Sequence, residues 1–295
     1  MRQTILLTGG SGFLGSNLLR RLVADGHDLI LLKRSKSDLS RISSVLSSIT
    51  AYNADTQNLT SIFEKHKIDT IVHCATNYGR GNQPPTEIIE ANLTLPLQLV
   101  QLAAKHGVRS FINSDTILDK QVSYYSLSKR QFLDWLSYFA SNLVCVNVAL
   151  EHFYGPFDDP SKFVTRIIQD LLRGVPQIDL TPGKQKRDFI YIDDVVHAYS
   201  KIITFTHAVD PGLHKFEVGS HLKMEIREFV ELVAKLTGNK KTILNFGALP
   251  YRKNEVMESS VDTSALEALG WNPRITIEEG IEKTIYEERK SIETP

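Results

Sequence analysis

Residues 3–15 read QTILLTGGSGFLG, an apolar run that passes directly into a glycine-rich turn. The run at 3–8 predicts a buried strand. Behind the turn, Leu14, Leu18 and Leu22 recur at helical spacing and predict an amphipathic helix. A strand, a glycine turn and a helix in this order are typical of the phosphate-binding unit that opens a dinucleotide-binding domain.

The glycine turn itself indicates a pyrophosphate site. Its run GSGFLG satisfies the dinucleotide fingerprint, and three of its glycines also recur at spacing three. Glycine permits a tight turn and a close backbone approach, and the following helix offers free N–H groups to phosphate. The alternative is a glycine turn with only a structural role. The residues assigned to the cofactor here are Gly9, Gly12, Phe13, Leu14 and Gly15.

Strands and helices continue to alternate up to about residue 150. A Ser-rich stretch at 35–48 predicts a loop with a short helix, and the segment 88–106 is the longest predicted helix. This alternation predicts an α/β fold, a Rossmann-type doubly wound parallel sheet with ligands at the carboxyl ends of its strands. The further predicted strands are 27–32, 68–75, 108–114 and 144–150.

The chain is long enough for a second domain. Its 295 residues exceed the usual single-domain size. We expect an NADP-binding Rossmann domain at 1–150, rejoined by about 187–210, and a smaller mixed α/β C-terminal lobe at 151–186 and 211–295. Within that lobe, the predicted helices are 163–173, 224–237 and 277–288.

Composition excludes several classes of partner. Lys+Arg and Asp+Glu both number 34, so no global field draws the chain to nucleic acid or membrane. The apolar runs are too short for a membrane span or a signal peptide. Cys74 and Cys145 lie in apolar, strand-like surroundings without metal-ligand spacing, which indicates reduced, buried thiols. We expect a cytoplasmic protein without a metal site.

The end of the second predicted strand favours NADP over NAD. An NAD site usually places an acid here for the ribose hydroxyls, whereas this chain has Lys33 and Arg34. Two cations suit a 2′-phosphate, and the alternative is a pair of solvated strand-end charges. Asp55 follows the third strand-like stretch. It is assigned either to the adenine amino group or to a surface turn.

A serine, a tyrosine and a lysine predict the chemistry. Tyr125 and Lys129 lie four residues apart, on one face of a helix, and Ser114 ends the preceding strand. The lysine charge favours the phenolate, so we expect the pKa of Tyr125 to be lowered and the phenol to act as proton donor. The serine hydroxyl can stabilise a carbonyl oxygen as it becomes an alkoxide. A tyrosine and lysine at this spacing also occur by chance in many helices.

These motifs together resemble the extended short-chain dehydrogenase/reductases that act on nucleotide sugars. The resemblance spans nearly the whole chain: the glycine turn, Asn92, the catalytic set, Tyr154-Gly155-Pro156, RDFIYIDDV and LGWNP. The segments FINSDT, LEHFYGPFDD, TPGKQKRDFIYIDD and NFGALPYRKNEVM look closest to the CDP-paratose and CDP-abequose synthases. The segment NYGRGNQPPTEIIEANLTLP is similar to the paratose type.

That resemblance implies an NADP-dependent oxidoreductase that reduces the 4-keto group of CDP-3,6-dideoxyhexulose during O-antigen sugar biosynthesis. It also implies a homodimer that pairs through two long helices. The cofactor residues it adds are Ala75, Thr76 and Asn92, beside Tyr125 and Lys129. The substrate residues it indicates are Tyr78, Arg80, Asp115, Thr116, His152, Lys162, Arg187 and Arg252. Of these, His152 is also compatible with packing, and the arginines with a solvated surface.

Departures from sister enzymes favour a reductase. In the nucleotide-sugar 4,6-dehydratases, an Asp-Glu pair follows the catalytic threonine and performs the elimination. Here Asp115 and Thr116 follow Ser114, so the second carboxylate is missing. The alternatives are a 4-epimerase, a reductase of a dTDP- or UDP-linked 4-keto-6-deoxysugar, and a non-catalytic NADP-binding regulator. A regulator needs no proton donor, and the complete catalytic set argues against it.

Overall fold

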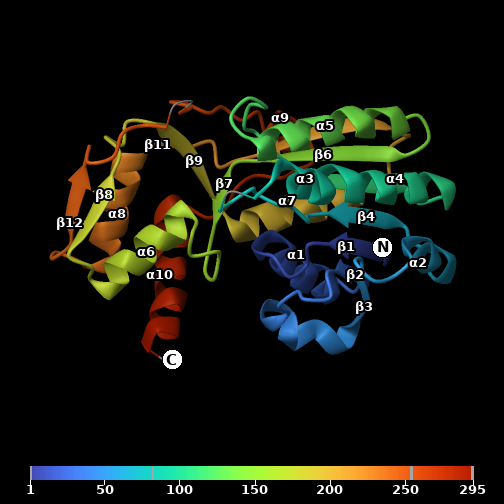
Figure 1. The fold of residues 1–295 in the computed structure, drawn as a ribbon, viewed down its shortest axis with the longest axis horizontal. Helices are drawn as coiled ribbons and strands as arrows, with labels where there is room; N and C mark the ends of the chain where they lie inside the picture. The colour runs from blue at the N-terminus through green and yellow to red at the C-terminus, as the bar shows by residue number, and fades with distance from the viewer. Residues whose placement is uncertain (1, 82, 253–254, 294–295) are drawn as a thin grey trace. The chain divides into compact units, whose positions relative to one another are not determined.

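The computed structural model describes residues 2–81, 83–252 and 255–293. Asn82, Lys253 and Asn254, within two of the segments quoted for the resemblance, lie outside the described residues. The chain divides into two compact units (Figure 1). The first unit comprises Met1–Leu150, Val196–Glu217 and Ser264–Trp271, and the second comprises Glu151–Val195, Val218–Thr263 and Asn272–Pro295.

A seven-stranded sheet forms the centre of the first unit, in the order β10-β6-β5-β4-β1-β2-β3. From β3 to β6, each strand pairs in parallel with its neighbours. The predicted doubly wound fold is therefore confirmed, and all parallel strands end at one edge. The strands are β1 Thr4–Thr8, β2 Asp28–Lys33, β3 Ile49–Asn53, β4 Thr70–His73, β5 Ser110–Thr116, β6 Val144–Leu150 and β10 Gly212–Val218.

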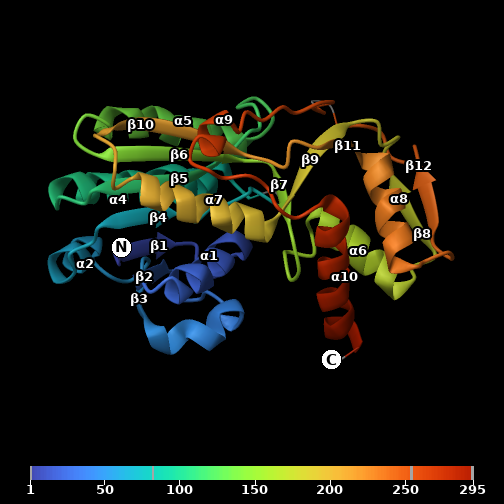
Figure 2. The same ribbon diagram turned by 180° about the vertical axis from the view of Figure 1, so that it is seen from behind.

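Helices cover both faces of this sheet. Figure 1 shows α4 and α5 on one face, and Figure 2, from behind, shows α1 and α7 on the other. Phe132 and Leu136 of α5 pack in one core cluster with Phe111 of β5, and none of the three has exposed surface. Burial of each such side chain stabilises the fold by about 1.5–3 kcal/mol. The helices are α1 Phe13–Ala24, η1 Ser40–Ser48, α2 Leu59–Lys65, α3 Pro85–Ile89, η2 Glu90–Thr94, α4 Leu95–Lys105, α5 Tyr124–Phe139, α7 Ile192–Phe205 and α9 Ser264–Glu267.

The segment predicted as one helix at 88–106 is divided into three. A π-helical turn, η2, separates α3 from α4. Pro96 lies in the first turn of α4 and has no N–H to donate to the carbonyl of Asn92, four residues earlier. The wide turn Glu90–Thr94 contains the carbonyl left without that bond, and Asn92 lies within it, fully buried.

The second unit contains two small sheets. One has the order β11-β9-β7, in which β9 runs antiparallel to β11 and parallel to β7. The other pairs β12 with β8 in parallel. These short strands were not predicted, whereas α6 lies where the sequence places it. The elements are β7 His152–Tyr154, α6 Phe163–Arg173, β8 Gln177–Leu180, β9 Lys186–Tyr191, β11 Lys223–Glu225, α8 Ile226–Thr237, β12 Ile243–Phe246 and α10 Ile277–Glu293.

The unit boundaries differ from the predicted domain boundaries after Leu150. The segment that returns to the first unit is Val196–Glu217, not about 187–210, because β9 pairs with β7 and β11 of the second unit. Ser264–Trp271 also belongs to the first unit, where the indole of Trp271 is fully buried. Over the part of the chain described here, no helix combines the length and apolar character needed to span a membrane.

Candidate active site

The glycine turn brings the backbone into close contact at the carboxyl end of β1. Gly9 has a φ of +73°, and a Cβ there would lie 2.5 Å from the amide nitrogen of Ala75. The amide of Gly12 donates to the oxygen of Gly9 at 2.9 Å, and a Cβ on Gly15 would collide with that same oxygen. Only glycine fits these positions, so the first turn of α1 starts directly behind the strand.

This geometry suits a dinucleotide pyrophosphate. Gly12 precedes α1 and has no side-chain oxygen to cap it, so the amides of the first helical turn stay available to an anion. Phe13 and Leu14 begin that turn, as predicted for the cofactor site. The missing Cβ atoms leave room for close approach of phosphate to the main chain.

Lys33 and Arg34 at the end of β2, and Asp55 after β3, lie in different environments. Lys33 donates through Nζ to Oδ1 of Asn53 at 2.7 Å, whereas Arg34 is exposed. Asp55 accepts from the hydroxyl of Ser35 at 2.6 Å and from its amide at 2.9 Å. These two bonds lower the pKa of Asp55. Asp55 thus closes the loop behind β2, which is the turn role left open by the sequence.

The sequence did not indicate a further cation, Arg41, which lies next to the glycine turn. Arg41, in η1, donates through Nη1 to the main-chain oxygen of Ser11 at 3.4 Å. Arg20 of α1 in turn donates to the oxygen of Arg41. The packing of η1 against α1 brings Arg41 there, and no local pattern in the Ser-rich stretch indicates that contact.

Lys129 is buried at the end of β5. Ser123 caps α5 and exchanges hydrogen bonds with Ser126, which fixes the start of the helix at Tyr124. Lys129 is 2% exposed, and its Nζ donates to the main-chain oxygen of Ser114 at 2.9 Å. Burial lowers the pKa of Lys129, and the nearby Asp115 acts in the opposite direction.

The pKa of Tyr125 is raised, not lowered. Burial is the largest cause, and Tyr78 and Asp115 act in the same direction. A hydrogen bond with the hydroxyl of Thr116 opposes them. The expectation that Lys129 lowers the pKa of Tyr125 is therefore corrected, because the ammonium is directed to the oxygen of Ser114. Tyr125 is held as a neutral phenol.

Ser114 has partners that the sequence did not indicate. Its hydroxyl accepts from the hydroxyl of Tyr199 at 2.6 Å and donates to Sγ of Cys74 at 3.2 Å. Tyr199 lies on α7 and is fully buried. The phenol of Tyr125 instead bonds to Thr116, two residues further along β5. Two hydroxyl groups thus lie at the end of β5, each beside a different tyrosine.

Asp115 is held within the sheet. Its Oδ1 accepts from the amide of Thr116 and its Oδ2 from Nδ2 of Asn147, each at 2.8 Å. Asn147 accepts from Asn113 at 2.8 Å, so a buried polar chain joins β5 to β6. The structure therefore gives both oxygens of this predicted substrate residue a protein partner.

Asn92 fixes the loop that follows β4. Its side chain accepts from the amide of Asn77 at 2.7 Å and from the hydroxyl of Thr76 at 3.2 Å. It donates to the oxygen of Asn77 and to the hydroxyl of Ser128 in α5. The amide of Ala75 meanwhile donates to the hydroxyl of Thr8 at 3.1 Å. Asn92 thus ties the Ala75–Thr76 segment, predicted for the cofactor, to α5.

Tyr78 and Arg80 lie in the same loop, next to Tyr125. The ring centroids of Tyr78 and Tyr125 are 5.0 Å apart. The guanidinium of Arg80 lies 5.1 Å from the centroid of the Tyr78 ring, a cation–π contact. The structure therefore brings these two predicted substrate residues together with the catalytic set.

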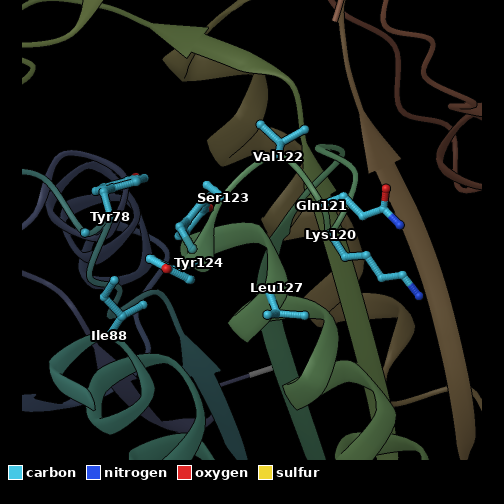
Figure 3. A pocket seen from close by; sticks show the side chains of 10 residues that line it. Tyr78, Ile88, Lys120, Gln121, Val122, Ser123, Tyr124 and Leu127 are labelled. Atoms are coloured by element: carbon cyan, nitrogen blue, oxygen red, sulfur yellow. The ribbon is translucent and has the colours of Figure 1, made fainter. Parts of the chain in front are cut away.

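A pocket of about 590 Å³ adjoins Tyr125. Figure 3 shows Tyr78 and Ile88 on one side of this pocket, Lys120 and Gln121 on the other, and Tyr124 between them. It is mostly apolar, with Lys120 as its cation. The residues that line it are Tyr78, Gly79, Ile88, Lys120, Gln121, Val122, Ser123, Tyr124, Tyr125 and Leu127.

In the second unit, His152 and Lys162 each have an acidic partner. Nδ1 of His152 lies 2.9 Å from Oε2 of Glu151, a carboxylate with no exposed side-chain surface. Lys162 pairs with Asp158 at 3.0 Å and lies over the ring of Phe153. Both side chains were predicted to contact the substrate, and both have partners within the protein.

The two predicted diphosphate arginines differ in environment. Arg187 is 8% exposed and pairs with Glu255 at 2.6 Å. Its Nη1 also donates to the oxygen of Lys186 at 2.7 Å. Arg252 is exposed. A diphosphate held by Arg187 must therefore share the guanidinium with Glu255 or replace it.

Known proteins resemble this chain over nearly its full length. Residues 5–219 match the model of the family described as NAD dependent epimerase/dehydratase. The CDP-abequose synthase of Salmonella muenchen is 34% identical over 294 residues, covering 97% of this chain and 98% of that protein. The UDP-glucose 4-epimerase of Mycolicibacterium smegmatis is 27% identical over 311 residues, covering 95% and 96%.

Solved structures share the fold. The UDP-glucose 4-epimerase of Thermotoga maritima, crystallised with UDP-glucose, superimposes with a TM-score of 0.84 at 24% identity, covering 98% of this chain and 99% of that one. The UDP-glucose 4-epimerase of Thermus thermophilus, in complex with NAD, gives a TM-score of 0.82 at 22% identity, covering 98% and 99%. At these identities the likeness bears on architecture alone.

Proposed function

Because the chain belongs to the NAD dependent epimerase/dehydratase family, we propose that it is an NADPH-dependent reductase of a nucleotide-linked 4-ketosugar. The favoured substrate is CDP-3,6-dideoxyhexulose, and the product is CDP-paratose or CDP-abequose. The 34% identity to a CDP-abequose synthase supports the CDP-linked substrate. The observation that carries the proposal is the half-buried phenol of Tyr125, at the edge of a pocket and one helical turn from the buried ammonium of Lys129.

In the proposed reaction, the bound nicotinamide supplies a hydride to carbon 4. Tyr125 gives its proton to the carbonyl oxygen as that oxygen gains charge, and solvent then restores the phenol. Ser114 donates a hydrogen bond to the same oxygen. Lys129 holds the end of β5 through the oxygen of Ser114 and adds positive charge beside the site. Carbon 4 gains the hydride and the oxygen gains the proton, so the ketone becomes an alcohol.

A reductase needs Tyr125 in its protonated form, and burial favours that form. Reduction produces an alkoxide, a strong base that accepts a proton even from a weakly acidic phenol. A 4-epimerase must first oxidise an alcohol, and that step needs the phenolate as base. Burial disfavours the phenolate at this position.

The proposed cofactor is NADPH. The glycine turn and the uncapped start of α1 fit the pyrophosphate. Arg34 is exposed where β2 ends, and the position carries no acid for ribose hydroxyls. A 2′-phosphate placed there gains a charge-assisted hydrogen bond from the guanidinium.

Elimination is not part of the proposed activity. By resemblance, Thr116 stands where the 4,6-dehydratases have their second carboxylate. Asp115 is bonded to Asn147 and to the amide of Thr116, which leaves its charge stabilised within the sheet. Ketone reduction requires neither carboxylate as a base.

For the nucleotide diphosphate we propose Arg187 and Arg252, with Lys162 and His152 as further substrate contacts. Arg187 is rigidly held, because its guanidinium bonds to Glu255 and to a main-chain oxygen. A preorganised guanidinium loses less entropy when it binds a diphosphate. Two such charge-assisted pairs contribute about 1.5–3 kcal/mol each.

The second candidate is a 4-epimerase, favoured by the 27% identity to a UDP-glucose 4-epimerase. The experiment that separates the two supplies the protein with NADPH and with 4-ketosugars carried on CDP, dTDP and UDP. Stoichiometric NADPH consumption with formation of a 4-hydroxy product, identified by NMR, supports the reductase. Interconversion of 4-hydroxy epimers without net oxidation of cofactor supports the epimerase.

The proposed assembly is a homodimer formed through α5. Tyr124, Leu127, Trp135 and Tyr138 are 63%, 39%, 48% and 81% exposed. Trp135 follows Tyr124, and Tyr138 follows Leu127, by eleven positions. Eleven positions are about three helical turns, so the four side chains share one helix face. A second copy buries this apolar face. Light scattering should give about twice the 33.2 kDa chain mass, and Trp135→Glu with Tyr138→Glu should halve it.

A further inference from the structure

The hydroxyl of Ser114 lies between a strong donor and a weak acceptor. Tyr199 donates to it at 2.6 Å from α7, and Ser114 donates onward to Sγ of Cys74 at 3.2 Å. Tyr199 has no exposed surface, and Ser114 is 7% exposed. All three residues belong to the first unit, on α7, on β5 and directly after β4.

The proton and lone pairs of the Ser114 hydroxyl determine which atoms donate in this series of hydrogen bonds. Ser114 has one proton and two lone pairs, and one lone pair accepts from Tyr199. Burial raises the pKa of Tyr199 well above its ordinary value, so Tyr199 keeps its proton and remains a donor. The proton of Ser114 is therefore directed away from Tyr199, toward Cys74.

We propose that Tyr199 is a positioning residue that orients the Ser114 hydroxyl as a donor to the ketone oxygen, with Cys74 as the interim acceptor of its proton. This inference rests on the proposed ketone reduction. Without the Tyr199 hydroxyl, Ser114 can rotate and direct its proton elsewhere. A donor already aimed at the developing alkoxide needs no reorganisation during the reaction.

A sulfur atom suits the role of interim acceptor. A thiol sulfur accepts hydrogen bonds weakly, so little is lost when the Ser114 proton leaves it for a substrate oxygen. Burial raises the pKa of Cys74 to about 11, which keeps the thiol neutral at physiological pH. A neutral sulfur does not hold the proton as strongly as a thiolate would.

The hydrogen bond from Tyr199 also makes Ser114 a stronger donor, in addition to orienting its hydroxyl. A hydroxyl that accepts a short hydrogen bond becomes a better donor, because chains of hydrogen bonds polarise one another in a low-dielectric interior. Tyr199 thus strengthens the bond that Ser114 makes to the alkoxide.

The decisive kinetic test is a double-mutant cycle between Tyr199→Phe and Ser114→Ala. Tyr199→Phe keeps the buried ring and removes one oxygen. We expect it to lower kcat roughly 10-fold with the substrate KM nearly unchanged, a fraction of the loss typical of a deleted oxyanion donor. In the Ser114→Ala background it should have no further effect on kcat. An equal loss in both backgrounds would show that Tyr199 does not act through Ser114, and would overturn the inference.

Tyr154→Phe is the matched control. Tyr154 is 1% exposed, and its hydroxyl donates to the oxygen of Ile277 at 3.2 Å in the second unit. This substitution also removes a buried, hydrogen-bonded hydroxyl, so it should lower stability to a similar extent. Its kcat should stay within about 2-fold of the parent, since a general loss of one buried hydrogen bond affects stability and not donor orientation.

Two substitutions of Cys74 test the interim acceptor. Cys74→Ala removes a weak acceptor and should leave kcat within about 3-fold, because the substrate oxygen replaces it. Cys74→Ser offers a strong oxygen acceptor in its place and should lower kcat more than alanine does. The opposite order, with serine more active than alanine, contradicts the proposed competition for the Ser114 proton.

An infrared measurement tests the network without turnover. The S–H stretch lies in a clear spectral window, and Cys74→Ala identifies its band against that of Cys145. Both Ser114→Ala and Tyr199→Phe should shift the Cys74 band in the same direction, whereas Tyr154→Phe should leave it in place. An unmoved band in Tyr199→Phe overturns the inference. Absence of turnover in the parent, with the band shifts present, instead overturns the proposed function.

Discussion

The ammonium of Lys129 lies 2.9 Å from the main-chain oxygen of Ser114, and this contact joins α5 to the end of β5. Tyr125 precedes Lys129 by one helical turn, so the same contact fixes where the phenol stands relative to the serine. The lysine thus contributes to the geometry of the catalytic set as well as to its charge.

Replacement of Lys129 by Met should therefore impair both position and charge. We expect kcat to fall at least roughly 100-fold, and stability to decrease because the buried oxygen of Ser114 loses its partner. Steady-state kinetics and thermal unfolding would measure the two effects. Arg130→Met is the control, because Arg130 makes an exposed ion pair with Asp134. Near-parent turnover in Lys129→Met would contradict the assigned role.

Tyr125→Phe should remove the proton donor. Loss of a general acid typically lowers the rate about 10²–10⁴-fold. The affinity for NADPH, measured by fluorescence titration, should change by no more than about 2-fold, because the ring remains. Tyr124→Phe serves as the matched control, because Tyr124 is the adjacent tyrosine and its side chain is 63% exposed. Equal turnover in the parent and in Tyr125→Phe would remove the acid assignment.

The pH dependence of reduction should reflect the raised pKa of Tyr125. The donor must be protonated, so activity is present below its pKa and is lost as pH rises through it. Since the ordinary value is about 10, kcat/KM should show no tyrosine limb between pH 7 and 9. Asp115→Asn removes a charge that raises this pKa, so the decline should begin at lower pH. A decline of the parent enzyme near pH 8 would indicate a lowered pKa instead.

Arg34 should decide between the two nicotinamide cofactors. Arg34→Ala should weaken NADPH binding roughly 10-fold to 100-fold, as expected for one charge-assisted contact, and should leave NADH binding nearly unchanged. Isothermal titration with both cofactors gives the ratio. Lys36→Ala, two residues further along and also exposed, is the control. An equal loss of affinity for NADPH and NADH would contradict a contact between Arg34 and the 2′-phosphate.

Local signals predicted the parts of the fold that local chemistry determines. The glycine turn was predictable because Gly9 and Gly15 occupy positions where a Cβ meets backbone. Helix α6 was predictable from its strongly amphipathic pattern. The short strands β8 and β12 carry too few residues for a periodic signal, and only their pairing stabilises them.

Contacts between distant segments were beyond sequence reasoning. Tyr199 reaches Ser114 across 85 positions of the chain, and Arg41 reaches the glycine turn across 30. The direction of the Tyr125 pKa shift was mispredicted for the same reason. Spacing indicated the nearby lysine, but it did not indicate how deeply the phenol is buried. Burial is a property of the packed structure, and so is the direction of the Lys129 ammonium, which donates to the oxygen of Ser114.

The most direct test of the proposed reaction follows the hydride itself. The protein is incubated with NADPH deuterated at the transferable position of the nicotinamide and with CDP-3,6-dideoxyhexulose, and the product is examined by NMR. The proposed mechanism predicts one deuterium at carbon 4 for each NADPH oxidised. Product formed without deuterium at carbon 4, or with label distributed elsewhere, would contradict it.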